Sequence, residues 1–211
     1  MQQIVIIDYH MGNLRSVANA FEKAGAGHAQ ILISQDPRVI AAADRVVFPG
    51  QGAARDCMLE LERLQLAGCI REAIDSKPFL GICMGLQVLL ESSDESPATP
   101  CLGILAGRVR KFPRADSQGR LLRIPQMGWN QVFQDIEHPL WRKIENGSRF
   151  YFANSYYADP EDRRVIAAHT PYGLPFASAL YSQKLFAVQF HPEKSQHAGL
   201  QLLRNFLDWQ P

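Results

Sequence analysis

The first half of the chain alternates short apolar runs with segments of helical periodicity. The apolar runs lie at residues 3–8, 31–33, 46–48 and 78–82, and a helical pattern follows each of them. The first helix is expected to run from Leu14 to Ala24 with Asn13 as its cap, and the last from Met84 to Glu91. Strands that alternate with helices in this way form a parallel sheet with helices on both faces. The sequence therefore predicts an α/β fold.

The second half of the chain has a different pattern. After Ser92, proline, glycine and alternating apolar and polar residues dominate. Such segments form short strands and hairpins, which we expect as far as Phe190, and a last helix then runs from Ser195 to Trp209. The chain has 211 residues, of which 46% are hydrophobic, and this suffices for one core. We therefore expect a single domain, residues 1–211, with hairpins added to a mostly parallel sheet.

A cysteine between two glycines ends the last apolar run, in Gly81-Ile82-Cys83-Met84-Gly85. A nucleophile on a sharp strand-to-helix turn needs neighbours without bulk, and glycines meet that need. The start of the following helix directs backbone N–H groups at the sulfur, which favours the thiolate and leaves an N–H for an oxyanion. A lone cysteine at such a junction is more often a small buried hydrophobic residue. The pattern therefore predicts a nucleophile only in company with a base.

The candidate base lies near the other end of the chain, in His191-Pro192-Glu193. Pro192 favours an extended backbone at His191, and residues two apart in an extended segment point the same way. Glu193 can therefore hold one nitrogen of the ring while the other takes a proton from Cys83, as in a catalytic triad. Taken alone, His-Pro-Glu is more often a surface histidine beside a solvated acid. Because the carboxyl ends of parallel strands share one edge, the two segments can meet there, and together they predict nucleophilic catalysis.

A third segment, Pro49-Gly50-Gln51-Gly52, follows another of the apolar runs. Its glycines let backbone N–H groups turn toward an anion or an oxyanion. Many strand-to-helix turns look like this for steric reasons alone. The segment matches neither a dinucleotide fingerprint nor a phosphate loop with its lysine, so its weight depends on the other motifs.

Charge and cysteine usage exclude several classes of function. The formal net charge is +1, which gives no reason to expect nucleic acid or an anionic membrane as a partner. No apolar run approaches the ~20 residues of a membrane span, and the first residues lack the basic start of a signal peptide. The cysteines are widely spaced and suit a reducing cytoplasm; Cys57, Cys69 and Cys101 have no flanking signature, and we interpret them as structural or incidental. No cluster of metal-ligating residues is visible in the sequence, so we expect neither a metal nor a cofactor.

Taken together, these motifs resemble those of the class I glutamine amidotransferases, which carry a catalytic triad, over nearly the whole chain. The cysteine and His-Pro-Glu motifs are typical of the whole class. Residues 12–16 (Gly-Asn-Leu-Arg-Ser) and 125–130 (Pro-Gln-Met-Gly-Trp-Asn) are similar to those of one group within it, the glutaminase subunits of imidazole glycerol phosphate synthases. The resemblance implies a flavodoxin-like fold, with a mostly parallel sheet flanked by helices and an added β-hairpin region in the second half.

The same resemblance implies a reaction and a partner. Glutamine would be hydrolysed to glutamate and ammonia through a γ-glutamyl thioester on Cys83, with His191 as base and Glu193 as its orienting carboxylate. The ammonia would pass to a (β/α)8-barrel synthase (cyclase) subunit in a heterodimer. There it would join a ribulosyl phosphate intermediate to give imidazole glycerol phosphate and an aminoimidazole carboxamide ribotide, a step of histidine biosynthesis.

By position in the motifs, the resemblance also assigns the other site residues. The oxyanion hole would be formed by Gly50, Gln51, Gly52 and Met84. Glutamine would be bound by Gly52, Gln87, Asn154, Ser155 and Tyr156. The synthase subunit would contact Asn13, Met127, Trp129, Asn130, Tyr151 and Lys194. From the residues alone, tryptophan and methionine in residues 127–129 are as compatible with core packing as with an interface.

Three positions depart from the usual pattern of this group. Gln51 stands where valine is common, Asn154 where histidine is common, and His10 where glycine is common. A backbone role for Gln51 survives the change, and Asn154 can still contact substrate or backbone. We expect His10 to be an exposed loop residue near the partner rather than a catalytic group.

Two other interpretations stay open from the sequence. The chain could instead serve anthranilate, aminodeoxychorismate or GMP synthesis, although Met-Gly-Trp-Asn at residues 127–130 favours the first assignment. It could also be a non-catalytic module that only regulates a partner, although the intact Cys83, His191 and Glu193 argue against this. Labelling of Cys83 by a glutamine-analogue electrophile would separate an enzyme from such a module.

Overall fold

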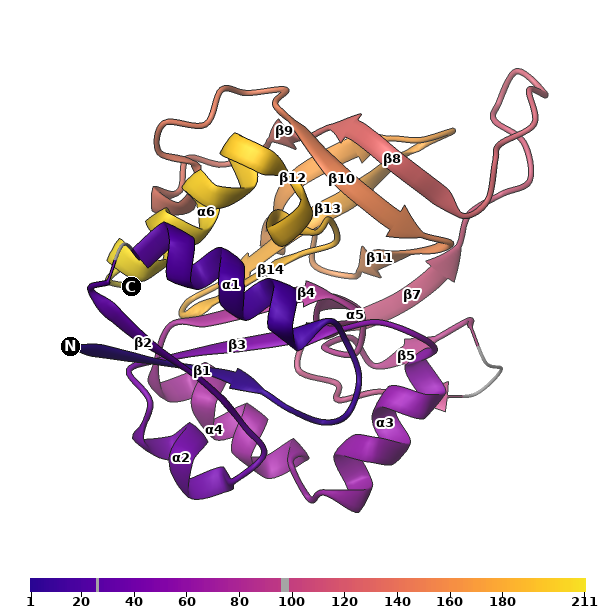
Figure 1. The fold of residues 1–211 in the computed structure, drawn as a ribbon. Coiled ribbons are helices and arrows are strands. Elements are labelled where there is room, and N and C mark those ends of the chain that lie inside the picture. The colour runs from indigo at the N-terminus through magenta and orange to yellow at the C-terminus, as the bar shows by residue number, and fades with distance from the viewer. Residues whose placement is uncertain (26, 96–98) are drawn as a thin grey trace.

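A central sheet covered by helices on both faces organises the computed structural model, which describes residues 1–25, 27–95 and 99–211 (Figure 1). The parallel part of the sheet has the strand order β2-β1-β3-β4-β14. Its strands are β1 (Gln2–Ile7), β2 (Ala29–Ser34), β3 (Arg45–Gly50), β4 (Phe79–Cys83) and β14 (Leu185–Val188). The predicted α/β fold on a parallel sheet is confirmed.

Helices cover both faces of this sheet. The helices are α1 (Leu14–Gly25) and α6 (Gln196–Asp208) on one face, and α2 (Pro37–Ala42), α3 (Ala54–Arg63) and α4 (Ala67–Ser76) on the other (Figure 1). In β1, Ile4 and Ile6 belong to the core under α1 and α6, whereas Val5 and Ile7 belong to the core on the opposite face. A continuous apolar strand of this kind is typical of a parallel sheet buried on both sides. In the part of the chain that the structure describes, no helix is long and apolar enough to cross a membrane.

Two of the helices begin at side-chain caps. The side chain of Asn13 accepts a hydrogen bond from Ser16 N at 3.2 Å, as predicted for the start of α1. Asp36 accepts from Arg38 N at 2.9 Å at the start of α2, where Pro37 occupies the first turn. Both caps satisfy backbone N–H groups that the first turn of a helix leaves without partners.

The second half of the chain adds short, mostly antiparallel strands to one edge of the sheet. Beyond β14 the order continues β13-β11-β7-β5-β6, β12 pairs with β13, β9 pairs with β12, and β8 and β10 form a separate antiparallel pair. These strands are β5 (Ser92–Ser93), β6 (Thr99–Pro100), β7 (Gly107–Lys111), β8 (Gln126–Gln131), β9 (Phe133–Gln134), β10 (Arg149–Asn154), β11 (Tyr156–Pro160), β12 (Ile166–Pro171) and β13 (Pro175–Ser182). Short 3-10 helices lie at η1 (Pro139–Trp141), η2 (Arg163–Val165) and η3 (Pro192–Lys194). The predicted hairpin region is therefore present.

The helix that follows Cys83 is shorter than predicted. The sequence pattern indicated a helix from Met84 to Glu91, but α5 spans only Met84–Gln87. The carbonyl groups of residues 88–91 accept hydrogen bonds from the backbone N–H groups of residues 101–105 instead of from a further helical turn. A tertiary hydrogen-bond pattern thus overrides local helix propensity at this point.

Candidate active site

Cys83 lies at the end of β4, where the chain turns sharply into α5. Its backbone adopts φ 56° and ψ −107°, a combination that residues with a side chain rarely adopt. A Cβ on Gly81 would lie 2.6 Å from the carbonyl oxygen of Gly85, and a Cβ on Gly85 would lie 1.8 Å from that of Phe48. The predicted need for neighbours without bulk is confirmed. The turn holds Cys83, which is 6% exposed, at the carboxyl edge of the parallel sheet.

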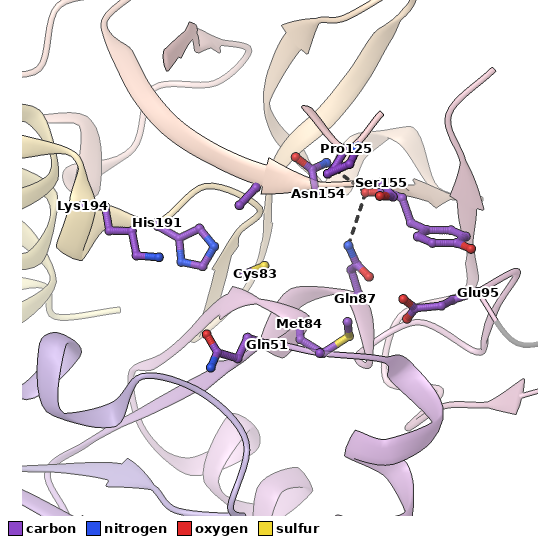
Figure 2. A pocket seen from close by; sticks show the side chains of 13 residues that line it. Gln51, Cys83, Met84, Gln87, Glu95, Pro125, Asn154, Ser155, His191 and Lys194 are labelled. Atoms are coloured by element: carbon purple, nitrogen blue, oxygen red, sulfur yellow. Dashed lines mark hydrogen bonds between the residues drawn. The ribbon is translucent and has the colours of Figure 1, made fainter. Parts of the chain in front are cut away.

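The histidine and the glutamate of the predicted triad follow β14, the strand next to β4. His191 Nδ1 lies 2.9 Å from Glu193 Oε1, and the two side chains are 8% and 3% exposed. The Ser195 hydroxyl donates to the carbonyl oxygen of His191 at 2.6 Å and thereby fixes the backbone of this segment. Glu193 holds one ring nitrogen, and Figure 2 shows the ring beside Cys83. The structure therefore brings the three predicted residues together.

The ionisation of His191 reflects this position. Burial lowers the pKa of the ring, but the Cys83 sulfur and the Glu193 carboxylate raise it by more, through charge and hydrogen bonding, to about 10. The protonated ring is thus stabilised by sulfur on one side and by a carboxylate on the other. The geometry therefore places a protonated imidazole ring beside the sulfur, and a cationic neighbour of this kind activates a cysteine as a nucleophile.

Cys83 and His191 open into a cavity of about 220 Å³ (Figure 2). Its wall is formed by Gln51, Gly52, Cys83, Met84, Gln87, Glu95, Pro125, Ala153, Asn154, Ser155, Tyr156, His191 and Lys194. All of the residues that were expected to bind glutamine therefore line one cavity with the nucleophile. Glu95, Pro125 and Ala153 were not assigned to it, because an acidic residue in a polar loop, a proline and a strand alanine carry no such signal.

The four expected oxyanion residues lie around Cys83. Gly50 pairs with Cys83 in the register of β3 and β4, and the other three line the cavity. The carbonyl oxygen of Gln51 accepts a hydrogen bond from the Cys57 thiol at 3.7 Å. Since a trans peptide is planar, the N–H of Gly52 points away from Cys57, opposite to the Gln51 carbonyl. Cys57, which the sequence analysis treated as structural or incidental, thus orients one peptide of this loop.

Two amide side chains among the residues that line the cavity carry buried oxygen atoms without partners in the described part of the chain. Gln87 Nε2 donates to the carbonyl oxygen of Tyr156 at 3.3 Å, and Asn154 Nδ2 donates to the same oxygen at 2.9 Å (Figure 2). Within the described ranges, Gln87 Oε1 and Asn154 Oδ1 are buried and accept no hydrogen bond. A buried acceptor without a donor is costly, so a ligand with N–H groups would stabilise this wall.

Gln189 is a site residue that the sequence analysis did not single out. Its Nε2 lies 3.6 Å from Cys83 Sγ, and its Oε1 accepts a hydrogen bond from Gln87 Nε2 at 2.9 Å. The signal that could have found it is its position two residues before His191. In an extended segment, that spacing directs both side chains to the same side.

The residues expected at a partner interface divide into two groups. Met127 and Trp129 alternate on one face of β8 and are 68% and 42% exposed. The ring of Trp129 packs edge-on against Tyr151, and Lys194 Nζ lies 5.8 Å from the centre of the Tyr151 ring. The side chain of Asn130 is instead engaged within the chain, where its amide donates to the carbonyl oxygen of Pro171 at 2.9 Å. Asn13 is the cap of α1.

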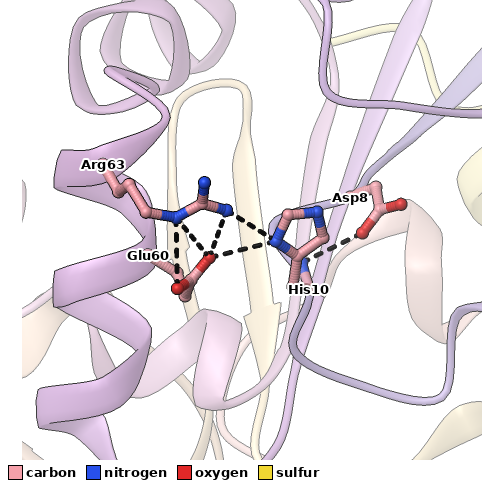
Figure 3. Close-up of polar contacts among 4 residues, drawn as sticks. All are labelled: Asp8, His10, Glu60 and Arg63. Carbon is pink, nitrogen blue, oxygen red and sulfur yellow. Dashed lines mark hydrogen bonds and ion pairs between the residues drawn. The ribbon is translucent and has the colours of Figure 1, made fainter.

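His10 lies outside the cavity, in the loop after β1, and its ring is half-exposed as expected (Figure 3). Its Nδ1 is 3.0 Å from Glu60 Oε2 and 2.8 Å from Arg63 Nη2, and Glu60 and Arg63 form an ion pair within α3. Its backbone N–H donates to Asp8 at 3.0 Å. The cluster ties the loop to α3. Neither this cluster nor any other in the described part of the chain groups His, Cys, Asp and Glu side chains to hold a metal ion.

Comparison with known proteins gives a consistent result. The chain matches the family model "Glutamine amidotransferase class-I" over residues 5–209. It is 53% identical over 214 aligned residues to the imidazole glycerol phosphate synthase subunit HisH of Methylococcus capsulatus, covering 100% of this chain and 98% of the relative. It is 54% identical over 211 residues to the HisH subunit of Thiobacillus denitrificans, covering 99% and 92%.

Solved structures are more distant in sequence and similar in fold. A crystal structure of a glutamine amidotransferase has a TM-score of 0.71 at 18% identity and covers 97% of both chains. The crystal structure of a glutamine amidotransferase from Thermotoga maritima has a TM-score of 0.60 at 16% identity, covering 98% of this chain and 83% of that one. At these identities the likeness concerns the fold alone.

The chain belongs to the class I glutamine amidotransferase family. Within that family, the full-length relatives compared above are HisH subunits of imidazole glycerol phosphate synthase. The predicted class and the predicted group are therefore confirmed.

Proposed function

We propose that the chain is the glutaminase subunit of an imidazole glycerol phosphate synthase, which hydrolyses glutamine and supplies the ammonia to a synthase subunit in histidine biosynthesis. The observation that carries the proposal is the buried pair of His191 and Glu193, 2.9 Å apart, beside Cys83 on the wall of a cavity. The HisH relatives at 53% and 54% identity over the whole chain support it.

Glutamine suits the polar groups of this cavity. Its α-ammonium group supplies the N–H donors that Gln87 Oε1 and Asn154 Oδ1 lack among the described residues. The backbones of Gly52, Ser155 and Tyr156 line the same wall and would hold the rest of the amino-acid group. With that end bound, the side-chain amide extends toward the sulfur of Cys83, as near-attack positioning requires.

Acylation uses the thiolate–imidazolium pair. The Cys83 thiolate attacks the amide carbon of glutamine, the carbonyl electrons move to oxygen, and backbone N–H groups of residues 50–52 and Met84 hold the oxyanion. His191 then gives its proton to the amide nitrogen. The carbon–nitrogen bond breaks, ammonia leaves, and a γ-glutamyl thioester remains on Cys83.

Deacylation returns the pair to its starting state. His191, now neutral, takes a proton from water as the water oxygen attacks the thioester carbon. The carbon–sulfur bond breaks, glutamate leaves, and Cys83 is again a thiolate beside an imidazolium. Glu193 holds the ring through Nδ1 in both steps.

The partner in this proposal is a (β/α)8-barrel synthase subunit that binds over the exposed face of β8. Met127 and Trp129 offer the apolar and aromatic surface that interface centres favour. Lys194 lines the cavity and also packs on Tyr151, so the ammonia would leave the cavity along this side. Asn13 and Asn130 would lie at the rim of the heterodimer contact. We place the reaction in the cytoplasm, because a catalytic thiolate needs reducing conditions and all four cysteines are free.

The test is the glutaminase rate with and without the ribulosyl substrate and the barrel synthase subunit. We expect strong stimulation by the loaded synthase, and loss of the stimulated activity in Cys83→Ser. Activity that the synthase does not change would contradict the assignment to this pathway and favour another synthase. Absence of activity together with no labelling of Cys83 by a glutamine-analogue electrophile would instead identify a regulatory module.

A further inference from the structure

Gln189 connects the nucleophile to the substrate wall through its side-chain amide. The residue follows β14, is 0% exposed, and its backbone N–H donates to the carbonyl oxygen of Ser178 at 2.9 Å. Its Nε2 lies 3.6 Å from Cys83 Sγ, and its Oε1 accepts from Gln87 Nε2 at 2.9 Å. The side-chain amide therefore has a partner on each side: its nitrogen contacts the Cys83 sulfur, which is the reacting atom, and its oxygen contacts Gln87.

One backbone carbonyl determines which way both amides point. The oxygen of Tyr156 can only accept, so the Gln87 group that faces it at 3.3 Å must be the NH₂ (Figure 2). The same NH₂ faces Gln189, so the Gln189 atom that accepts this hydrogen bond must be its side-chain oxygen. The NH₂ of Gln189 is then directed at the sulfur of Cys83. If the Gln189 amide were flipped, its NH₂ would face the NH₂ of Gln87, and its oxygen would face the sulfur, which is also an acceptor. The contacts therefore allow only one orientation of this amide.

This orientation has a chemical consequence. A donor that faces a sulfur in a buried site stabilises the thiolate more than the thiol, because hydrogen bonds to charged groups are the stronger ones. His191 approaches the sulfur as the proton partner, whereas Gln189 keeps its proton and serves as a permanent donor. Gln87 Oε1 takes no part in this chain of contacts: among the described residues it is buried and accepts no hydrogen bond.

We propose that Gln189 is a further catalytic residue, whose amide N–H stabilises and positions the Cys83 thiolate, and that Gln87 acts on Cys83 through it. Gln87 then has two functions: its oxygen contacts the substrate, and its NH₂ holds Gln189 in the donating orientation. The inference deepens the proposed glutaminase function, which it takes as given, but its test does not need glutamine or a partner.

The experiment measures the rate of Cys83 alkylation by iodoacetamide against pH, read from the Cys83 peptide by mass spectrometry. The rate follows the thiolate fraction, and its midpoint belongs to the coupled cysteine–histidine pair. In Gln189→Met, which keeps the side-chain volume without the donor, we expect the midpoint to rise by about one pH unit. In Gln189→Glu, where a carboxylate faces the sulfur, we expect a larger rise. An unchanged midpoint in both folded variants would overturn the proposal.

Two further variants separate this role from packing and from substrate binding. Gln87→Met removes the group that orients Gln189, so we expect a smaller rise of the midpoint, whereas a residue that only binds glutamine would leave it unchanged. Asn154→Leu is the matched control, since Asn154 donates to the same Tyr156 oxygen but not to Gln189, and its midpoint should equal that of the wild type. If the Gln189 variants do not fold, Gln87→Met against Asn154→Leu decides the question. An inactive wild type with these midpoint shifts would refute the glutaminase proposal but not the role of Gln189 at the sulfur.

Discussion

The backbone of Gly85 lies against the carbonyl oxygen of Phe48, so closely that a Cβ on Gly85 would stand 1.8 Å from that oxygen. The contact joins the first turn of α5 to β3, the strand that carries Gly50 opposite Cys83. It therefore packs the turn that carries Cys83 against the strand that carries Gly50. A glycine at position 85 is a requirement of backbone packing as well as of the sharp turn.

Gly85→Ala should abolish glutaminase activity and lower the free energy of unfolding by roughly 3 kcal/mol, because a backbone carbonyl cannot move aside as a flexible side chain can. Urea unfolding and a glutaminase assay measure the two effects. Gly68→Ala is the matched control, since Gly68 lies in α4 with nothing within 4 Å of an added Cβ. It should keep activity and gain up to about 1 kcal/mol. A Gly85→Ala protein as stable as the wild type would contradict the close contact.

The backbone conformation at position 83 should cost more free energy with a residue that has a side chain, such as Cys83, than with glycine. At φ 56° and ψ −107°, a side chain at this position is strained, whereas glycine adopts such angles freely. We expect Cys83→Gly to unfold with a free energy about 1–2 kcal/mol higher than Cys83→Ala, although both are inactive. Denaturant unfolding of the two variants side by side measures the difference. In an unstrained strand or helix the order is reversed, so a more stable alanine variant would show that no strain is stored here.

The parallel half of the fold could be predicted because its signals are local. Each of its strands is a continuous apolar run, and caps such as Asn13 and Asp36 mark where helices begin. The end of α5 could not be predicted, because N–H groups of residues 101–105 determine it. Strands of two residues, such as β5 and β9, are too short to show a periodicity, and only their partners define them.

The grouping of Cys83, His191 and Glu193 could be predicted for the same reason, since a glycine-flanked cysteine and a histidine two residues before a glutamate are local patterns. The contacts of Gln189 and Cys57 could not be predicted, because they are made with partners outside their own segments; the position of Gln189 two residues before His191 indicates a side of the chain but not the partner. Gln189 meets a sulfur 106 positions away, and Cys57 meets the carbonyl of Gln51 across a turn. A glutamine after a strand and a buried cysteine each have an ordinary structural interpretation in the absence of coordinates.

Cys57 and Cys101 should resist alkylation in the folded protein. Burial raises the pKa of the Cys57 thiol to about 12 and that of the Cys101 thiol to about 11, so at pH 8 the thiolate is on the order of 0.1% or less at either position. A short treatment with iodoacetamide followed by peptide mass spectrometry should modify Cys83 first. Cys57 and Cys101 should react only when urea is added. Rapid modification of Cys57 in the folded state would show that its contact with Gln51 is open to solvent.

His138 should make the fold sensitive to acid. It lies among the rings of Tyr181, Phe186 and Trp209, its Nδ1 accepts from Leu140 N at 3.2 Å, and burial lowers its pKa from 6.5 to about 4. Between these values the unfolded chain binds more protons than the folded one, so the free energy of unfolding falls as the pH drops from 6.5 toward 4.

The variant His138→Asn keeps an acceptor for the N–H at the start of η1 but does not titrate. Urea unfolding at pH 7, 5.5 and 4.5 should show the wild type losing roughly 2 kcal/mol more than the variant, after allowance for partial exposure. Parallel pH dependences of the two proteins would mean that the ring remains accessible to water.

Trp129 should contribute more to synthase binding than its exposed area alone suggests. It is 42% exposed and rests on Tyr151, so the ring is already ordered before a partner arrives, and large ordered aromatic side chains dominate interface energies. We expect Trp129→Ala to raise the dissociation constant of the proposed barrel subunit by at least about tenfold, or roughly 1.4 kcal/mol, measured by calorimetric titration. Leu59→Ala is the matched control, because Leu59 is 52% exposed on α3, away from the β8 face, and its loss should leave binding unchanged. If the two variants bind equally well, the partner does not use the exposed face of β8.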